Sequence, residues 1–290
     1  MDELILDILK QLRDGSQGAL DTHQLEMLIN SHNSGIDSSA HSTEREKLIP
    51  KRAILPYFLQ VKQNNDELWQ SWNVTPELEE RFIHSVRMKP RRTASGVATI
   101  TVITRPHTCS SNCIYCPCDL RMPKSYLANE PACQRAALTF FDPYVQVAAR
   151  LQALHQMGHS TDKVELIVLG GTWSDYPESY QFWFIKDLFR ALNEWPNSPN
   201  HIKERLNWYT SFGLQNSEEA LSSFVVEQQA AVFDDTVTYN QAFHKLYDAS
   251  QPHQSAWSQM QSTYDELVEQ QRVNETAAAR VVGLVIETMP

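Results

Sequence analysis

The sequence predicts an α/β protein in which a small helical domain precedes an incomplete parallel β-sheet. Helical periodicity runs through most of residues 1–90. Three short runs of aliphatic and β-branched residues follow at about 96–104, 163–171 and 280–288, and they are typical of buried strands. Long helical patterns separate these runs, and strands that alternate with helices indicate βαβ units. We therefore expect a helical domain over 1–90 and an α/β domain over 91–290.

The helical domain is expected to contain two blocks. Apolar residues recur at helical spacing over 1–30 and again over 51–86, and a polar, Ser-rich linker at 31–44 separates them. Proline should interrupt the second block near Pro56. A helix should restart at Pro76, because proline is favoured at the first position of a helix.

The α/β domain carries three further helical regions. Residues 130–157 have a helical pattern with a break near Pro143, and 177–195 form an amphipathic helix. A polar insert occupies about 197–276 and has few apolar residues for its length. We expect the insert to be helical, and to be either partly disordered or a lid that binds a partner.

Composition limits the class of protein. Of the 290 residues 42% are hydrophobic, but no run approaches the ~18 apolar residues of a membrane helix. The N-terminus lacks the basic and apolar regions of a signal peptide. Five cysteines, four of them within ten residues, are a poor disulfide framework and suit a metal or cluster site in a reducing compartment. We predict a cytoplasmic protein with no membrane partner.

Charge is unevenly distributed along a chain whose formal net charge is −10. Eight basic residues and one acidic residue lie between Arg81 and Lys124, whereas ten acidic and two basic residues lie between Asn216 and Ala279. Such asymmetry is compatible with a local phosphate-binding patch or with a solvated basic face.

A cysteine loop follows the first predicted strand, and we use this name for residues 105–118, RPHTCSSNCIYCPC. Cys109, Cys113 and Cys116 form a C-x3-C-x2-C motif, and three neighbouring thiolates suit a [4Fe–4S] cluster with one iron left open. S-adenosylmethionine (SAM) can bind that iron, as it does in radical-SAM enzymes. An aromatic residue often precedes the third cysteine in those enzymes, and Tyr115 stands at this position.

The remaining cysteines leave alternatives open. With Cys118 as a fourth ligand the loop could hold structural zinc, although zinc sites usually pair their cysteines in two separate hairpins. We favour Cys118 as a non-ligating residue. Cys133 lies in a predicted helix, where we expect a small, packed, apolar side chain.

The other two predicted strands also end in suggestive residues. Gly170, Gly171 and Thr172 follow the second strand, and Glu287 ends the third. Ligand sites in parallel sheets form at the carboxyl ends of the strands. We expect the two glycines to admit close backbone contact with SAM, with Thr172 beside them, and Glu287 to contact SAM or substrate.

Several stretches together resemble a known family. They are KPRRTASGVA, RPHTC, CIYCP, KSYLANEPA, the run from Phe141 to Trp173, and RVVGLVIETMP. In this order and spacing the chain resembles the catalytic subunit of Elongator and its single-chain bacterial and archaeal relatives. These are tRNA wobble-uridine carboxymethyluridine synthases, with a radical-SAM domain followed by an acetyltransferase-like domain.

The resemblance implies an incomplete radical-SAM (β/α) partial barrel and a tRNA-modifying acyltransferase. Such an enzyme uses SAM and acetyl-CoA to install a carboxymethyl-type group at C5 of the wobble uridine. The resemblance further implies that Lys163 contacts acetyl-CoA and that the cluster needs an electron donor. The basic run that matches a region near the family's tRNA-binding part comprises Arg87, Lys89, Arg91 and Arg92. No catalytic side chain is assigned.

The chain departs from the family pattern in three places. The gap between Cys109 and Cys113 is short, Met289 stands where an arginine is usual, and the sequence stops at Pro290, before the barrel is complete. We expect an N-terminal portion that does not carry out acetyl transfer alone, with a second chain as one source of the missing part. The alternatives are a radical-SAM enzyme with a different substrate, a non-catalytic tRNA-binding protein, and a zinc-stabilised binding module.

Overall fold

The computed structural model describes residues 1–15, 18–34, 48–111, 113 and 115–288. Residues 35–44 of the predicted linker and Met289 lie outside the described residues. The chain divides into two compact units, which we describe separately. Unit 1 comprises Met1–Ser95 and Ala153–Ser160, and unit 2 comprises Gly96–Gln152 and Thr161–Pro290.

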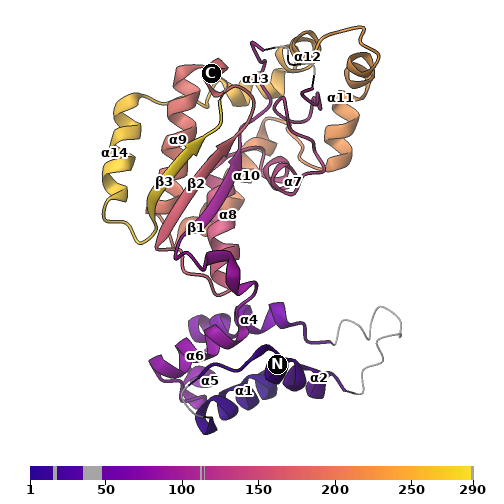
Figure 1. Cartoon of the computed structure of the whole chain (residues 1–290). Coiled ribbons are helices and arrows are strands. Elements are labelled where there is room, and N and C mark those ends of the chain that lie inside the picture. Colours follow the sequence, from indigo (N-terminus) through magenta and orange to yellow (C-terminus); the bar gives the residue numbers. More distant parts are fainter. Residues whose placement is uncertain (16–17, 35–47, 112, 114, 289–290) are drawn as a thin grey trace. The chain divides into compact units, whose positions relative to one another are not determined.

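Unit 1 is built from helices (Figure 1). In chain order they are α1 (Asp2–Asp14), α2 (Thr22–Asn33), α4 (Lys51–Asn64), α5 (Asp66–Ser71) and α6 (Pro76–Val86), followed by the 3-10 turn η1 (Pro90–Thr93). The predicted start of α6 is confirmed, because Thr75 Oγ1 accepts a hydrogen bond from the backbone N–H of Leu78 at 3.3 Å. Pro76 then occupies the first turn, where its missing N–H has no helical partner to lose.

Unit 1 has its own aromatic and aliphatic core. Phe58 of α4 stacks on Phe82 of α6 with ring centroids 4.1 Å apart, and Trp72 stacks on the Phe58 ring at 6.0 Å. Helix α4 continues through Pro56, so the predicted interruption there is wrong. Leu55 and Phe58 flank this proline in the core, and their burial offsets the hydrogen bond that proline cannot donate.

Unit 2 contains the strands and the remaining helices. The strands are β1 (Ala98–Ile103), β2 (Lys163–Leu169) and β3 (Arg280–Ile286). The α-helices are α7 (Pro131–Leu138), α8 (Pro143–Gln156), which ends in unit 1, α9 (Glu178–Asn193), α10 (Ile202–Ser211), α11 (Glu218–Phe233), α12 (Tyr239–Phe243), α13 (Gln251–Trp257) and α14 (Tyr264–Asn274). Shorter turns are η2 (Trp173–Asp175), η3 (Ser198–His201) and the π-helical η4 (His244–Asp248).

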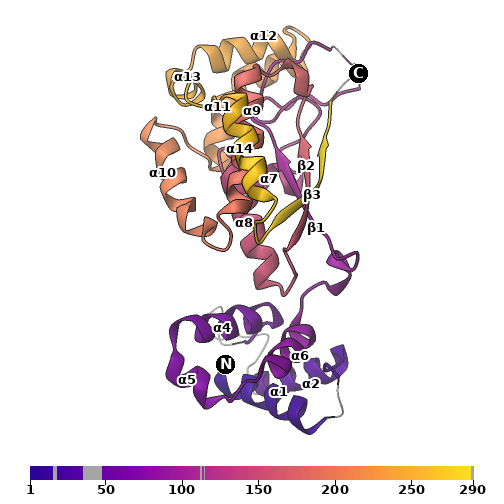
Figure 2. The ribbon, with the colours of Figure 1, turned by 90° about the vertical axis from the view of Figure 1, so that its left-hand side faces the viewer.

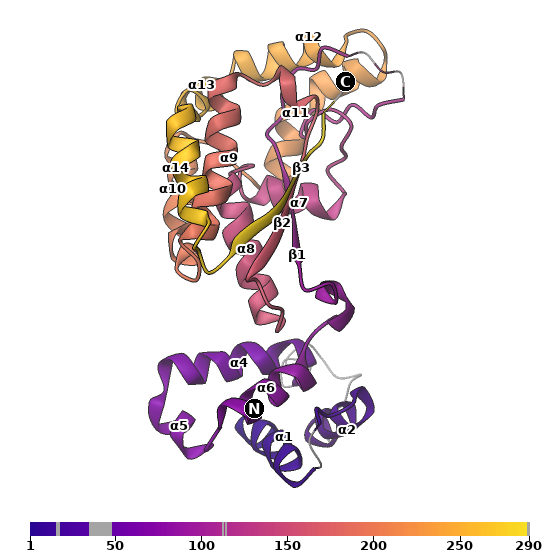
Figure 3. The same cartoon turned by 60° about the vertical axis from the view of Figure 1, so that its left-hand side comes forward.

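The three strands form one parallel sheet in the order β1-β2-β3. Along β2, alternate side chains are fully buried, and these are Val164, Leu166 and Val168. Helices α8, α9 and α14 gather on one side of the sheet (Figures 2 and 3). A parallel sheet covered by helices and preceded by a helical unit confirms the predicted fold class.

Strand β3 lies at one edge of this sheet. Its apolar side chains are unusually accessible, with Val282 56%, Leu284 37% and Val285 48% exposed. Among the described residues, no helix is long and apolar enough to cross a bilayer.

The polar insert is folded. Its residues form helices α10 to α14, so the alternative of partial disorder is wrong. Aromatic rings replace the missing aliphatic anchors: Tyr239, Phe243 and Tyr247 are buried in one cluster with Val225 and with Leu120 from the segment after the cysteine loop. A few large rings bury as much apolar surface as many small side chains, which explains why a low aliphatic content misled the prediction.

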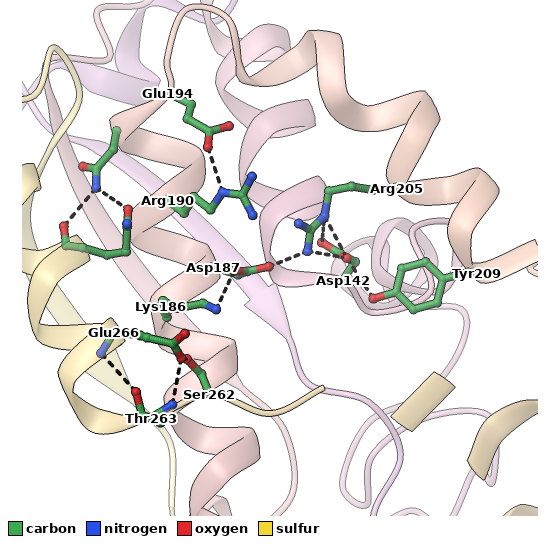
Figure 4. Close-up of polar contacts among 12 residues, drawn as sticks. Asp142, Lys186, Asp187, Arg190, Glu194, Arg205, Tyr209, Ser262, Thr263 and Glu266 are labelled. Atoms are coloured by element: carbon green, nitrogen blue, oxygen red, sulfur yellow. Dashed lines mark hydrogen bonds and ion pairs between the residues drawn. The ribbon is translucent and has the colours of Figure 1, made fainter. Parts of the chain in front are cut away.

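Arg205 of α10 joins the insert to the helices that cover the sheet (Figure 4). Its Nη2 lies 2.9 Å from Oδ2 of Asp142 and also contacts the carboxylate of Asp187 in α9. Tyr209 donates a second hydrogen bond to Asp142 at 2.8 Å. Burial alone would lower the pKa of Arg205, but the two carboxylates outweigh it and raise that pKa. These residues line a cavity of about 420 Å³, and because their charges are paired with one another we assign the network a structural role.

Candidate functional site

The carboxyl ends of the three strands meet at one edge of the sheet. Backbone pairing continues just past the strands, because the N–H of Thr104 donates to the carbonyl of Leu169 at 2.9 Å and the N–H of Glu287 donates to that of Val168 at 3.0 Å. The start of the cysteine loop, the segment from Gly170 and the end of β3 are therefore neighbours. This is the edge at which ligands bind in parallel sheets.

Cys109 is the deeply buried member of the cysteine motif, with 7% of the residue exposed. Its Sγ lies 3.3 Å from Oγ1 of Thr172, so the loop after β1 meets the segment after β2. The backbone N–H of Ser110 donates to Oδ2 of Asp175 in η2 at 2.6 Å. These contacts hold the start of the cysteine loop against the residues that follow β2.

Cys113 and Cys116 are half-buried on a turn. The backbone N–H of Cys116 donates to the carbonyl of Cys113 at 3.2 Å, and Sγ of Cys116 lies 3.1 Å from Oγ of Ser125. Tyr115 between them is 85% exposed. The turn therefore directs an aromatic ring to solvent beside the two thiols.

The thiols of this loop can be tested against the cluster that the sequence predicts. Cys109, Cys113 and Cys116 are free, and thiolate is the donor type that a [4Fe–4S] cluster requires. Within the described part of the chain, no three His, Cys, Asp or Glu side chains are placed as a metal-ligand group, and Cys109 and Cys116 contact hydroxyls instead. The donor chemistry of the three thiols fits the predicted cluster.

A buried lysine lies beside these thiols. Lys124 is 4% exposed, and its Nζ donates to the carbonyl of Ser111 at 2.8 Å. Burial raises the pKa of the Cys118 thiol, the Lys124 ammonium opposes that rise, and the thiols of Cys116 and Cys109 add to it. Burial therefore prevails at Cys118, and the pKa of its thiol is raised although the Lys124 ammonium lies in the same region.

Gly170 and Gly171 have different surroundings. A Cβ at Gly170 would lie 2.0 Å from Oγ1 of Thr104, so packing between β1 and β2 is sufficient to require glycine there. A Cβ at Gly171 would meet nothing closer than the backbone of Lys124 at 3.9 Å. Gly171 therefore has free space beside the segment after the cysteine loop, and contact of either glycine with SAM stays a prediction.

Glu287 is exposed just after β3 and accepts a hydrogen bond from the hydroxyl of Tyr126. Burial raises the pKa of Tyr126, and the bond to the carboxylate raises it further, so the phenol stays a donor. The pair ties the end of β3 to the segment after the cysteine loop. A direct contact of Glu287 with SAM or substrate stays a prediction.

Lys163 lies away from this edge of the sheet. It is exposed at the first position of β2, whereas the cysteine loop adjoins the last. A strand of this length spans roughly 20 Å at ~3.3 Å per residue. The structure therefore does not bring Lys163 together with the cysteine loop, and its contact with acetyl-CoA stays a prediction.

The basic residues of the sequence fall into two groups. In unit 1, Lys89, Arg91 and Arg92 are exposed on and before η1, and Arg87 is half-buried. The members of the basic stretch from Arg81 to Lys124 that lie in unit 2 differ from these: Arg105 and Lys124 are buried, and Arg121 forms an ion pair with Asp119 at 2.7 Å. A phosphate-binding surface therefore has its candidate residues in unit 1.

The insert supplies contacts that the sequence analysis missed. Asn240 of α12 donates through Nδ2 to the carbonyl of Cys109 at 2.8 Å and accepts at Oδ1 from the N–H of Cys109 at 3.1 Å. Gln229 of α11 donates to the carbonyl of Cys118 and accepts from the N–H of Leu120, both at 2.8 Å. The two amides thus bracket the cysteine motif, one at each end.

Two buried tyrosines extend this contact. The hydroxyl of Tyr239 donates to the carbonyl of Met122 at 2.9 Å, and that of Tyr247 donates to the carbonyl of Leu120 at 2.6 Å. The partners are 117 and 127 residues apart in the chain. No local pattern marks these tyrosines as neighbours of the cysteine loop, because only the tertiary fold brings them to it.

Comparison with curated proteins identifies relatives over part of the chain, and no protein-family profile matches it. The chain is 41% identical over 139 residues to the tRNA uridine(34) acetyltransferase of Methanocaldococcus infernus, and the match covers 46% of this chain and 26% of that protein. It is 48% identical over 105 residues to the protein of the same name from Dehalococcoides mccartyi, covering 36% and 23%. It is 38% identical over 146 residues to Elongator complex protein 3 of Bos taurus, covering 47% and 26%.

A solved structure of the archaeal Methanocaldococcus infernus Elp3, with an N-terminus deletion, matches 67% of this chain and 23% of its own at 25% identity and a TM-score of 0.31. The chain spans about a quarter of the length of the curated relatives it matches. Partial coverage of this kind fits the expected N-terminal portion. Over the shared region, the chain is a relative of the tRNA uridine(34) acetyltransferases and of Elongator complex protein 3.

Proposed function

We propose that this chain forms part of an enzyme that modifies the wobble uridine of tRNA. The proposal depends above all on one observation, the loop of free thiols at the carboxyl end of β1. Support comes from the relatives, which are named for acetyl transfer to tRNA uridine 34 or for Elongator and are 38–48% identical over the shared region.

In this proposal Cys109, Cys113 and Cys116 hold a [4Fe–4S] cluster. Bound there, the cluster would supply the electron that cleaves SAM and begins radical chemistry. Thr172 contacts Sγ of Cys109 at 3.3 Å and positions that thiol, and the buried Lys124 holds the loop between Cys109 and Cys113 by donating to the carbonyl of Ser111. Tyr115, Gly170, Gly171, Thr172 and Glu287 are the proposed contacts of SAM.

The remaining partners follow from the exposed cations. Lys163 is proposed to bind acetyl-CoA, the source of the carboxymethyl-type group added at C5 of the uridine. Lys89, Arg91 and Arg92 are proposed to contact phosphates of the tRNA, which would position the substrate without reading its bases. An electron donor is required to reduce the cluster.

Anaerobic iron–sulfur reconstitution followed by electron paramagnetic resonance (EPR) tests this proposal. We expect a [4Fe–4S] signal from the reduced protein that shifts when SAM is added, because SAM would bind the open iron. Stoichiometric zinc with no iron would contradict the proposal and favour a zinc-stabilised binding module. Cleavage of SAM that does not depend on acetyl-CoA would favour a radical-SAM enzyme with a different substrate.

Cysteine variants make the test specific. Cys109→Ala, Cys113→Ala and Cys116→Ala should each abolish the signal. Cys118→Ala should retain it, and so should Cys133→Ala, a matched control because Cys133 is fully buried in α7 among apolar residues. Loss of the signal in the Cys118 variant with retention in Cys113→Ala would overturn the ligand assignment.

Binding of tRNA is tested separately. Neutralising Lys89, Arg91 or Arg92 should weaken binding, and the salt dependence of the affinity should fall by about one ion for each phosphate that the variant no longer neutralises. Lys10→Ala is a control on an exposed position of α1 in the same unit. Equal salt slopes for wild type and the three variants would exclude phosphate binding by these residues.

A further inference from the structure

Arg105 is a buried arginine without an acidic partner. It is 7% exposed, and its Nη1 donates to the carbonyl of Pro106 at 3.1 Å. Its Nε is buried and has no hydrogen-bond partner. Its Nη2 also makes no hydrogen bond to any residue that the structure describes. Arg205, by contrast, is only half-buried and has two carboxylates. Arg105 therefore carries a charge inside unit 2 with no acidic hydrogen-bond partner among the described residues; burial lowers its pKa, and more distant groups that include Asp248 oppose this.

Aromatic rings surround this guanidinium. Its Cζ lies 3.9 Å from the ring centroid of Trp257, 4.8 Å from that of Tyr180 and 6.0 Å from that of Tyr176. Cation–π contacts recover part of the energy lost on burying a cation. They offer no oxygen to the N–H groups, however, and the hydroxyls of both tyrosines are bonded to the backbone of Arg105 instead. The Nε–Nη2 edge remains without an acceptor.

A small cavity adjoins Arg105. Its volume is about 40 Å³, which exceeds the roughly 10–15 Å³ that a single water requires and suits a group the size of a carboxylate or phosphate. The side chains with polar groups that line it include Arg105, Arg121, Tyr209, Gln215, Tyr247 and His253. None of the described lining residues is Asp or Glu, and because the guanidinium of Arg121 is bonded to Asp119 and Ser222, Arg105 is the arginine left for a ligand.

The electrostatics of His253, which lines the cavity, agree with a positive charge there. Burial, and then the charge of Arg105, lower the pKa of His253 from 6.5 to about 4. This imidazole is therefore neutral near pH 7. The charge of Arg121 is balanced by Asp119, which leaves Arg105 as the net positive group among the described residues around the cavity.

We propose that Arg105 anchors a binding site for an oxyanion, the carboxylate or phosphate group of a small-molecule ligand. The planar Nε–Nη2 edge of arginine matches such groups through two parallel hydrogen bonds. The residue lies two positions after β1, at the edge of the sheet where ligands bind. The proposal goes beyond the proposed function and needs neither a cluster nor SAM.

Titration of iron-free wild-type protein with inorganic phosphate and with acetate tests this site. We expect a saturable shift of the Arg105 Nε–H resonance in ¹⁵N NMR, with no shift for the exposed Arg272. A shift with phosphate alone assigns a phosphate ligand, and one with acetate alone assigns a carboxylate. A folded protein in which neither anion moves the Arg105 resonance overturns the proposal.

Two variants complete the test. Arg105→Lys keeps the positive charge and loses the planar fork, so it should weaken anion binding by about tenfold or more. Arg272→Lys should bind as wild type does, because Arg272 is exposed and paired with Glu269. Wild-type affinity in Arg105→Lys would refute a site built on the guanidinium edge. Because iron is absent from these measurements, their failure is distinct from failure of cluster assembly.

Discussion

The side-chain amide of Asn240 makes two hydrogen bonds with the backbone of Cys109, which precedes it by 131 residues. The bonds satisfy both the N–H and the carbonyl of a buried residue that has no strand or helix partner. A single amide of the insert therefore fixes the position at which the cysteine motif begins.

Replacing Asn240 with alanine should loosen this part of the loop. Loss of two hydrogen bonds to buried backbone groups should lower the free energy of unfolding by about 1–3 kcal/mol. Alkylation of Cys109 by iodoacetamide, followed by mass spectrometry on the iron-free protein, should become faster. Asn207→Ala on the exposed face of α10 serves as the control, with an expected change within about 0.5 kcal/mol. An unchanged labelling rate in Asn240→Ala would show that the amide does not restrain the loop.

Gly170→Ala and Gly171→Ala should differ sharply although the residues are adjacent. The new methyl at Gly170 would lie 2.0 Å from Oγ1 of Thr104, so β1 or the segment after β2 must move, which should destabilise unit 2 by about 1–3 kcal/mol. At Gly171 the nearest atoms are 3.9 Å away, an ordinary contact. Urea unfolding of both variants checks the prediction, and Thr104→Ser in the Gly170→Ala background controls for the shape of the side chain at Thr104. Equal stability of the two glycine variants would contradict it.

Arg205→Met should be strongly destabilising. The change leaves Asp142 and Asp187 buried without their shared cation, and breaking a buried ion pair in this way typically lowers stability by about 3–5 kcal/mol. Thermal and urea unfolding measure the effect. Arg272→Met removes an exposed cation from α14 and should leave the unfolding transition in place. The triple variant that combines Arg205→Met with Asp142→Asn and Asp187→Asn should recover part of the lost stability. If its stability equals that of Arg205→Met alone, repulsion between the two carboxylates is not the cause of the loss.

His253 should make stability depend on pH. Burial and the nearby Arg105 lower its pKa from 6.5 to about 4, so the folded protein binds its proton less readily than the unfolded chain does. The free energy of unfolding that depends on a neutral His253 is fully present above pH 6.5. About 3 kcal/mol of it is lost as the pH falls toward 4, because the unfolded chain takes up the proton first. Urea midpoints measured between these pH values should fall less steeply in His253→Gln than in wild type. Parallel slopes in His253→Gln and wild type would refute the assignment.

Local patterns predicted the elements that depend on local physics. The three strands, the break before Pro143 and the start of α6 at Pro76 all follow from residue spacing and from proline's missing N–H. Pro56 shows where this reasoning fails, because the burial of Leu55 and Phe58 in a tertiary core keeps α4 continuous. Helix propensity is a weak preference that packing can override.

The candidate site likewise contains residues that local patterns predict and residues that only the tertiary fold brings together. The motif Cys109-x3-Cys113-x2-Cys116 and the residues that follow β2 are local, and the parallel topology alone places them together. Asn240 and Gln229 could not be identified from the sequence, because a lone amide in a polar helix has the same pattern whether it faces solvent or a loop. The charge of Arg105 was visible, but its lack of an acidic partner is a property of the fold.

The amide contacts of the insert also determine when, during synthesis of the chain, the cysteine loop can reach its final structure. The cysteine loop leaves the ribosome before the residues that hold it, since Gln229 follows Leu120 by 109 residues and Asn240 follows Cys109 by 131. At about 5–20 residues per second, translation must continue on the order of ten seconds before both amides exist. During that interval the nascent thiols have no restraint from α11 and α12. The loop acquires its final shape only when the insert has been made.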